Sequence, residues 1–165
     1  MIRGLLLIGL LLTGAVDAAT DKANLAIWPI DVVSLGAPLS EADQLSIEFI
    51  VPDILASIFS QTGLSLVERE RLLEILSEQK LGASALADEA TRLRLGKLLG
   101  AQSMLFGQYT AIAGQWQLDL RVVATQSSEV LASASADNQS GDLFMVVEGL
   151  AAQLAGTLAP SNDEN

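Results

Sequence analysis

The sequence predicts a single α/β domain, built on a mixed parallel and antiparallel sheet of about five strands with helices packed on it. Two observations lead to this prediction. Short apolar runs alternate with segments of helical periodicity through the first two thirds of the chain, which is typical of parallel strands joined by helices. Two longer alternating segments then follow, separated by a short glycine-containing loop, and they indicate an antiparallel hairpin.

The first part of the chain predicts a strand, a helix and a second strand. Residues 24–30 form an apolar run that reads as a buried strand ended by Pro29. Residues 64–67 form another short apolar run. With a helix between them, the two strands should lie parallel in one sheet. Residues 31–38, which follow the first strand, are expected to be a loop.

The helix of this unit should begin after Ser40, whose hydroxyl can cap it with Asp43 as the reciprocal partner. Pro52 interrupts the helix, so the chain must form either one kinked helix or two helices. Because the apolar periodicity continues through the proline, we favour one kinked helix. The predicted inward-facing residues are Ile47, Ile50, Val51, Ile54, Leu55, Ile58 and Phe59.

Two further helices should follow the second strand. The first begins at Arg69, and Gly82 stands where it should end. Asp88 can cap the second through Thr91, and Gly100 is placed to end it. The predicted inward-facing residues are Leu72, Leu73 and Leu76 in the first helix and Leu95, Leu98 and Leu99 in the second.

The last part of the chain predicts antiparallel strands and a helix. Residues 104–111 and 116–125 should form a hairpin through the loop 113–115. Residues 130–136 read as a weaker edge strand of small residues. Asp142 can cap a final helix. The inward face of that helix should consist of Leu143, Val147, Leu150, Ala151, Leu154 and Leu158.

The segment 64–109 carries a family signal. The residues that form it are Val67, Glu68 and Arg69, then Leu73, Ile75, Leu76, Glu78, Gln79, Lys80, Leu81 and Gly82, and finally Leu95, Gly96, Lys97, Leu98, Leu99, Gly100, Ala101 and Gly107. As a run they resemble the CsgG family, the curli production assembly and transport proteins of the bacterial outer membrane and periplasm. The resemblance implies a fold similar to CsgG and to the N-terminal domain of TolB. It also implies protein contacts in the secretion of curli-like or other surface polymers.

The N-terminus has the pattern of a secretory signal peptide over residues 1–18, with Arg3, an apolar stretch at 5–12 and small residues before the expected cut. The alternative is a retained membrane anchor, but that apolar stretch is much shorter than the roughly 20 residues that span a bilayer. We therefore expect a CsgG-like α/β domain over 19–159 and a disordered tail over 160–165.

Export without cysteine sets the expected location. Secretory members of this family are commonly lipoproteins that carry a cysteine just after the signal, whereas this sequence has none. We therefore expect an unlipidated periplasmic protein that folds without disulfides. Any association with the outer membrane would then depend on an anchored partner.

Composition excludes several kinds of chemistry. Without histidine or cysteine the chain lacks Ser-His and Cys-His nucleophiles and the usual zinc and iron ligand sets. Glu70, Glu74 and Glu78 are spaced to form one solvated helix stripe, and they do not suggest a catalytic pair. The net charge of −11 argues against binding nucleic acid. We expect no catalytic residue, no metal and no cofactor, and therefore no enzyme.

The basic residues are unevenly distributed. None occurs between Lys22 and Arg69 or after Arg121. If the two halves fold onto opposite sides, one face carries mixed charge and the other is acidic. Either this is only an uneven solvated surface, or the two faces steer a head-to-tail contact between protomers. The family motif and candidate interface comprise Glu68, Arg69, Glu78, Gln79, Lys80, Gly82, Arg92, Arg94, Gly96, Lys97 and Gly100.

Two of these residues stand at a special place. Glu68 and Arg69 lie where a predicted parallel strand ends and a helix begins, which in open α/β sheets is where ligands and partners dock. Either the two residues form a structural salt link at that corner, or they have a binding role.

The expected function is a non-enzymatic accessory or assembly component of cell-envelope secretion, of the curli type. The alternative is a periplasmic regulatory binding module, similar to the activators of penicillin-binding proteins or the start of TolB. The expected partners are envelope secretion or assembly proteins and other copies of this chain. A secretion pore is disfavoured, because the domain needs its only long hairpin for its own sheet, so no stable membrane span is expected.

Overall fold

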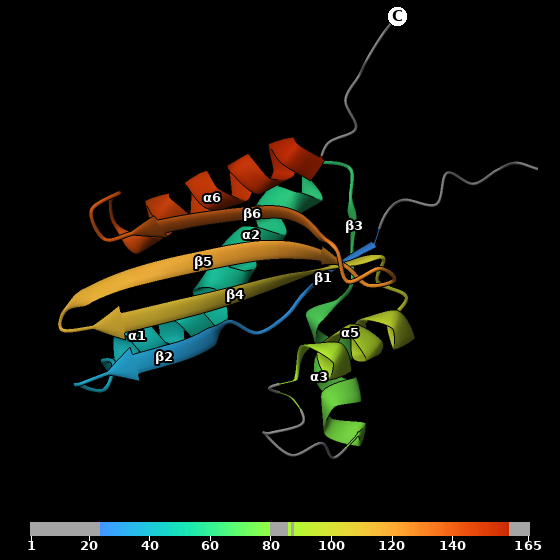
Figure 1. The fold of residues 1–165 in the computed structure, drawn as a ribbon, viewed down its shortest axis with the longest axis horizontal. Coiled ribbons are helices and arrows are strands. Elements are labelled where there is room, and N and C mark those ends of the chain that lie inside the picture. The colour runs from blue at the N-terminus through green and yellow to red at the C-terminus, as the bar shows by residue number, and fades with distance from the viewer. Residues whose placement is uncertain (1–23, 80–85, 87, 159–165) are drawn as a thin grey trace, which may run out of the picture.

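Residues 24–79, 86 and 88–158 are described by a computed structural model, in which six strands form one mixed sheet with helices on both faces (Figure 1). The sheet order is β3-β1-β4-β5-β6, and β2 lies beside the second half of β4. The predicted α/β fold with a mixed sheet is therefore confirmed. The strands are β1 (Asn24–Ile27), β2 (Asp31–Leu35), β3 (Ser65–Leu66), β4 (Ser103–Ile112), β5 (Gln115–Ala124) and β6 (Val130–Asp137).

The parallel part of the sheet follows the prediction with one addition. β1 pairs in parallel with β3 and with the first residues of β4. The expected loop over 31–38 is wrong, because Asp31–Leu35 forms β2. β1 covers only Ser103–Leu105 of the ten-residue β4, so the rest of that edge is open to pairing. Val32 and Val33 suit a strand, and they take up that pairing.

The first helical run is continuous but irregular. It consists of α1 (Glu41–Leu45), a π-helical segment η1 (Ser46–Ile50) and α2 (Val51–Ser60). The Ser40 hydroxyl accepts a hydrogen bond from the Asp43 N–H at 3.1 Å, so the predicted cap is confirmed. The run is one helix, as favoured. Its irregularity is the π turn before Pro52, where the chain has an extra residue.

Three residues predicted to face inward are exposed: Ile50, Leu73 and Leu98. The π turn changes the helical phase just at Ile50, which is 45% exposed. In α5 (Glu89–Leu98), Gly96 faces the sheet. Leu98 lies about 200° further around the helix and points away. Leu73, in α3 (Arg69–Glu78), lies beside the buried Leu72 on the flank of its helix.

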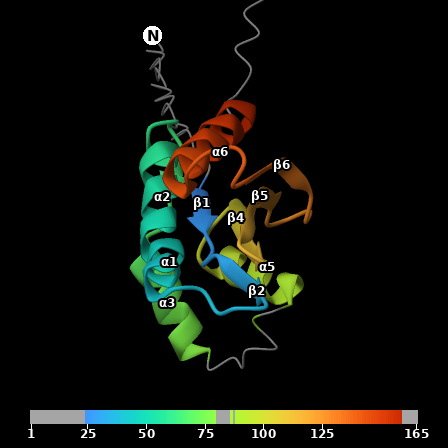
Figure 2. The same ribbon diagram turned by 90° about the vertical axis from the view of Figure 1, so that its left-hand side faces the viewer.

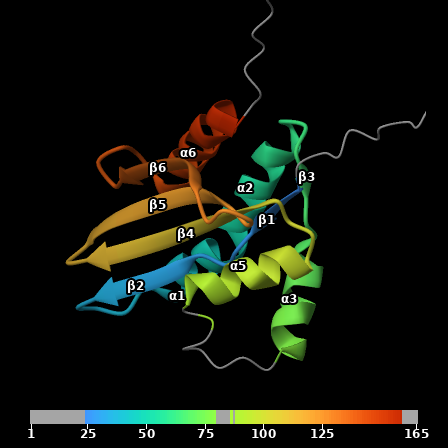
Figure 3. The same ribbon diagram turned by 45° about the vertical axis from the view of Figure 1, so that its right-hand side comes forward.

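The helices form two layers with separate cores (Figures 2 and 3). The run α1–η1–α2 and the final helix α6 (Leu143–Leu158) cover one face, where Phe59, Leu105 and Leu154 share a core. α3 and α5 cover the other face near its β1 end, where Leu72, Leu95 and Met104 share the second core.

The antiparallel part agrees with the sequence. Ala113 and Gly114 connect β4 to β5 with φ of 51° and 79°, which is the two-residue turn that suits a hairpin. β6 lies at the sheet edge, as expected. Asp142 caps α6 by accepting from the N–H groups of Phe144 and Met145. The predicted signal peptide and tail lie outside the described residues.

Candidate interaction surface

Arg69 donates a hydrogen bond to a backbone carbonyl that Pro52 cannot reach as a donor. Proline has no N–H, so it cannot donate to the carbonyl of Glu48, four residues earlier. The Arg69 guanidinium donates to that carbonyl at 2.8 Å and lies 5.7 Å from the ring centre of Phe49. The expected salt link between Glu68 and Arg69 is not among the ion pairs of the described residues. Arg69 therefore joins α3 to η1.

Glu68, at the same corner, has no ion pair with any of the described residues. It precedes α3 with an extended backbone (φ −60°, ψ 131°), and its side chain is exposed. A cavity of about 210 Å³ lies beside it between β3 and α2. Ile27, Pro52, Leu66 and Val67 line much of this cavity, so its chemistry is largely apolar.

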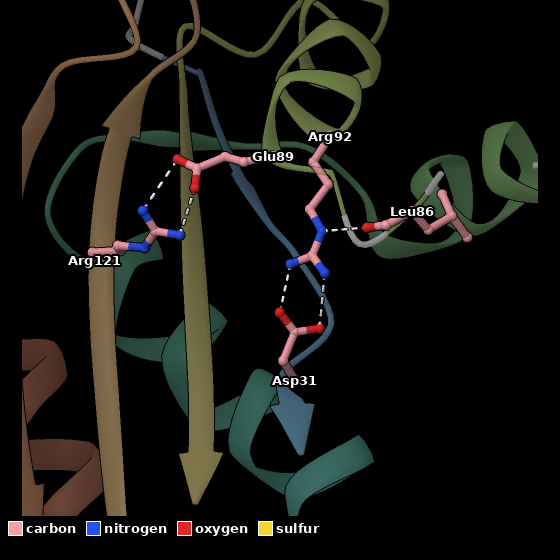
Figure 4. A network of polar contacts seen from close by, with 5 residues as sticks. All are labelled: Asp31, Leu86, Glu89, Arg92 and Arg121. Carbon is pink, nitrogen blue, oxygen red and sulfur yellow. Dashed lines mark hydrogen bonds and ion pairs between the residues drawn. The ribbon is translucent and has the colours of Figure 1, made fainter. Parts of the chain in front are cut away.

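Arg92 is fully engaged inside the protein (Figure 4). Its two terminal nitrogens donate to the two carboxylate oxygens of Asp31, and its Nε donates to the carbonyl of Leu86. The guanidinium carbon also lies 5.5 Å from the ring centre of Trp28. With a side chain only 12% exposed, Arg92 braces α5 against the start of β2 and offers little surface to a partner.

Arg94 and Lys97 are the cations of α5 that face solvent. Arg94 donates to the hydroxyl of Thr91 at 2.9 Å, which leaves most of its guanidinium free. Lys97 lies in the last turn of the helix, where a cation is favoured by the partial negative charge of the carbonyl end.

Two glycines of the family motif, Gly96 and Gly100, serve the fold. A Cβ at Gly96 would lie only 2.3 Å from Sδ of the buried Met104 and 3.2 Å from Cγ2 of Thr125. Gly100 has φ of +74°, a conformation that ends α5 and that other residues adopt at a cost. Packing at Gly96 and backbone conformation at Gly100 thus explain why these two positions of the motif carry glycine.

The end of α3 is solvent-facing. Glu70, Glu74 and Glu78 are exposed along one side, as expected for a solvated stripe, and Gln79 caps the helix end. Lys80 and Gly82, the remaining candidates, lie outside the described residues.

The two helical layers differ in charge. The layer of α1, η1, α2 and α6, here called the acidic layer, contains only acidic charged residues. These are Glu41, Asp43, Glu48, Asp53 and Glu148. The layer of α3 and α5, here called the mixed layer, contains both signs. Its charged residues are Arg69, Glu70, Arg71, Glu74, Glu78, Glu89, Arg92, Arg94 and Lys97. The acidic layer and the mixed layer therefore lie on opposite faces of the sheet, as a head-to-tail contact between protomers requires.

Two polar pairs had no signal in the sequence. Asp31, in an expected loop, pairs with Arg92, and Glu89 pairs with Arg121 of β5 through two hydrogen bonds of 3.1 and 2.8 Å. Both pairs lie on the sheet face that α5 only partly covers (Figure 4). Such pairs join residues far apart in the chain, and periodicity carries no information about them.

The described residues contain no group of three or more acidic, histidine or cysteine side chains arranged to hold a metal. Within the same residues, no helix combines the length and the apolar character that a membrane crossing needs.

Solved structures share this fold. The lipoprotein GNA1162 from Neisseria meningitidis superposes with a TM-score of 0.57 at 17% identity, over 82% of this chain and 99% of that one. The C-terminal domain of LpoB from Escherichia coli gives a TM-score of 0.52 at 16% identity, over 73% and 85%. The same domain from Salmonella enterica gives 0.52 at 15%, with the same coverage. Identities this low establish the fold alone.

Sequence comparison finds one family match, over part of the chain. No curated protein sequence matches the chain significantly. The family described as the curli production assembly/transport component CsgG matches residues 50–116, from the end of η1 to the start of β5. This stretch contains Arg69, Gly96 and Gly100, whose structural roles are given above. The resemblance found in the sequence is thus confirmed by a match to the CsgG family over residues 50–116.

Proposed function

We propose that this protein is a non-enzymatic accessory component of cell-envelope assembly or secretion, of the curli production type. It acts in the periplasm, exported by its N-terminal signal and unlipidated, through contacts with other proteins. The match to the CsgG family supports an accessory role in the envelope. The observation that carries the proposal furthest is the difference in charge between the two helical layers.

The charged layers suit contact between successive protomers. A head-to-tail contact joins two different surfaces of the same chain, so it gains from surfaces of complementary charge. Arg94 and Lys97 project from the mixed layer, whereas Asp53 and Glu148 project from the acidic layer on the opposite face of the sheet. Arg92, first considered for such a contact, is held by Asp31 and is a poor choice for the test.

The test is the molar mass of the mature protein, residues 19–165, by size exclusion with light scattering at low and moderate salt. We expect a discrete oligomer that weakens as salt screens the charges. Arg94→Glu with Lys97→Glu should weaken it, and so should Asp53→Lys with Glu148→Lys. Combining all four reversals restores opposite charges and should recover association. Failure of the combined variant to recover would contradict the contact.

The same mature protein can be used to identify the partner by co-purification. Co-purification with a secretion channel or a fibre subunit would support the curli-type role. A clean monomer at every salt concentration, together with capture of a peptidoglycan synthase, would favour the alternative regulatory binding module.

A further inference from the structure

β2 presents an open backbone edge. On one side its residues pair with β4, from Asp31 opposite Gln108 to Leu35 opposite Ile112. β1, which lies along the first part of the same β4 edge, is covered on its outer side by β3. The described residues provide no such covering strand for β2, which lies at the border of the sheet (Figures 1 and 2).

The side chains of β2 are unusually apolar for an open edge. Val32, Val33 and Leu35 are 47%, 37% and 56% exposed. Edge strands are ordinarily protected from further pairing by a charge, a proline or a bulge. The one charged residue of β2, Asp31 at its start, is paired with Arg92. Residues 32–35 contain neither charge nor proline, and their register with β4 is regular. The strand therefore keeps the features that permit another strand to pair with it.

Apolar surface flanks this edge on both faces of the sheet. On the face of the acidic layer, a cavity of about 370 Å³ separates β2 from α1 and η1. It is lined by Pro29, Ile30, Val32, Gln44, Ile47 and Glu48. On the other face Leu35 lies beside Ile112, which is 48% exposed. An added strand would thus place side chains against apolar groups on both faces.

The charge around the edge is negative. Glu41, Asp43 and Glu48 are exposed on the helical run beside β2, and neither that run nor β2 contains a basic residue. Two cations that contact these elements are already engaged, Arg69 with the Glu48 carbonyl and Arg92 with Asp31. This charge selects a basic occupant.

The opposite edge of the sheet lacks this combination. β6 consists largely of alanine and serine, and α6 packs against it. Its exposed large side chains, Val130 and Leu131, stand only at its start.

We propose that β2 binds an extended, basic segment of another polypeptide, which adds to the sheet as a further strand. The segment carries apolar residues at alternate positions, with lysine or arginine between them. Backbone hydrogen bonds to β2 supply affinity, and the apolar surfaces and acidic side chains select the sequence. This surface is separate from the charged layers of the proposed function and goes beyond it.

The probe is a fluorescein-labelled peptide of about nine residues in which lysine and valine alternate, a length that exceeds β2 at both ends. Binding to the purified protein is followed by fluorescence anisotropy. We expect saturable binding. A peptide with two central valines replaced by proline keeps the charge but cannot pair as a strand, and should bind at least about tenfold more weakly. A glutamate–valine peptide should also bind more weakly.

Matched variants locate the site. Val33→Lys places a like charge on β2, whereas Val130→Lys makes the same change on β6. We expect Val33→Lys to weaken binding about tenfold or more and Val130→Lys to change it by less than about twofold. Leu35→Lys replaces Val33→Lys if circular dichroism shows that the latter does not fold. The proposal would be overturned if Val33→Lys and Val130→Lys weakened peptide binding equally, or if the proline peptide bound as tightly as the lysine–valine peptide.

The two proposals fail independently. Arg94 and Lys97 lie on α5 but take no part in the Arg92–Asp31 pair that joins α5 to β2. Arg94→Glu with Lys97→Glu should therefore leave peptide binding unchanged even if it weakens self-association. Loss of peptide binding in that variant would contradict a site on β2.

Discussion

Arg92 and Asp31 are 61 positions apart in the chain, and their side chains form a two-point ion pair between α5 and β2. Arg92 is also bound to the carbonyl of Leu86 and lies against Trp28. A guanidinium already held at these two sites loses little further freedom on pairing with a carboxylate. The pair therefore fixes where β2 begins.

We predict that the Arg92–Asp31 pair couples more strongly than the pair Arg121–Glu89. The Arg92 and Asp31 side chains are 12% and 45% exposed, so one partner of this pair is largely shielded from water. Arg121 and Glu89 are 42% and 41% exposed, so water screens both partners. Double-mutant cycles with alanine, measured by urea unfolding, should give a coupling free energy of at least about 1 kcal/mol for the first pair and below about 0.5 kcal/mol for the second. Equal coupling free energies would show that the burial of Arg92 and its contacts with Leu86 and Trp28 do not strengthen its pair with Asp31 beyond an ordinary surface pair.

Gly96→Ala should destabilise the protein, because its Cβ would be forced against the buried Met104 and Thr125. The expected loss in the free energy of unfolding is about 1–3 kcal/mol. Gly149→Ala is the matched control in α6, since no atom lies within 4 Å of the added Cβ. That change should stabilise the protein by about 0.5–1 kcal/mol through better helix propensity. Thermal unfolding of both variants decides the question, and a stabilised Gly96→Ala would refute the packing argument.

Ala113→Asn should stabilise the hairpin. Ala113 has φ of 51°, which costs an alanine about 1 kcal/mol, and asparagine followed by Gly114 is the favoured pair for this turn. The midpoint of urea unfolding should rise. Ala113→Val should lower it, because a β-branched side chain tolerates positive φ least. The same shift for both variants would contradict the turn geometry.

Stability should fall on acidification partly through Asp88. The hydrogen bond from the Thr91 hydroxyl, together with that from the Thr91 N–H, lowers the pKa of Asp88 below its ordinary value of 3.8. Because the folded pKa lies below the unfolded one, the contribution is fully present above about 3.8 and is lost as pH falls through the folded pKa.

Asp88→Asn tests this pH dependence, because asparagine caps a helix without a charge. Urea unfolding of both proteins between neutral and acidic pH should show a smaller acid loss for Asp88→Asn. Asp88→Ala should instead be less stable than wild type already at neutral pH, since it lacks the cap. A parallel decline of wild type and Asp88→Asn would rule out the charge of Asp88 as a cause.

Local patterns were enough to predict much of this fold. Asp88 and Gly100 bound α5 because a cap and a positive φ depend on neighbours in the chain. The hairpin through Ala113 and Gly114 was predictable because alternating burial and the turn act over a few residues. The family motif was visible for the same reason, and its match covers residues 50–116.

Contacts between distant segments decided the rest. β2 forms because β4 is longer than β1, which no pattern within residues 31–38 records. From the sequence, Arg92 is a cation that could lie in the candidate interface. Its pairing with Asp31 depends on how α5 packs on the sheet, which only the tertiary structure shows.

The sequence by itself determined the class of fold, the caps and turns, and the absence of cysteine and histidine. The tertiary structure alone decided which cations remain free, which layer is acidic, and that β2 has an open edge. The physical reason is range. Capping, periodicity and turn geometry act within about one helical turn, whereas ion pairing, burial and strand pairing depend on chain segments brought together by folding.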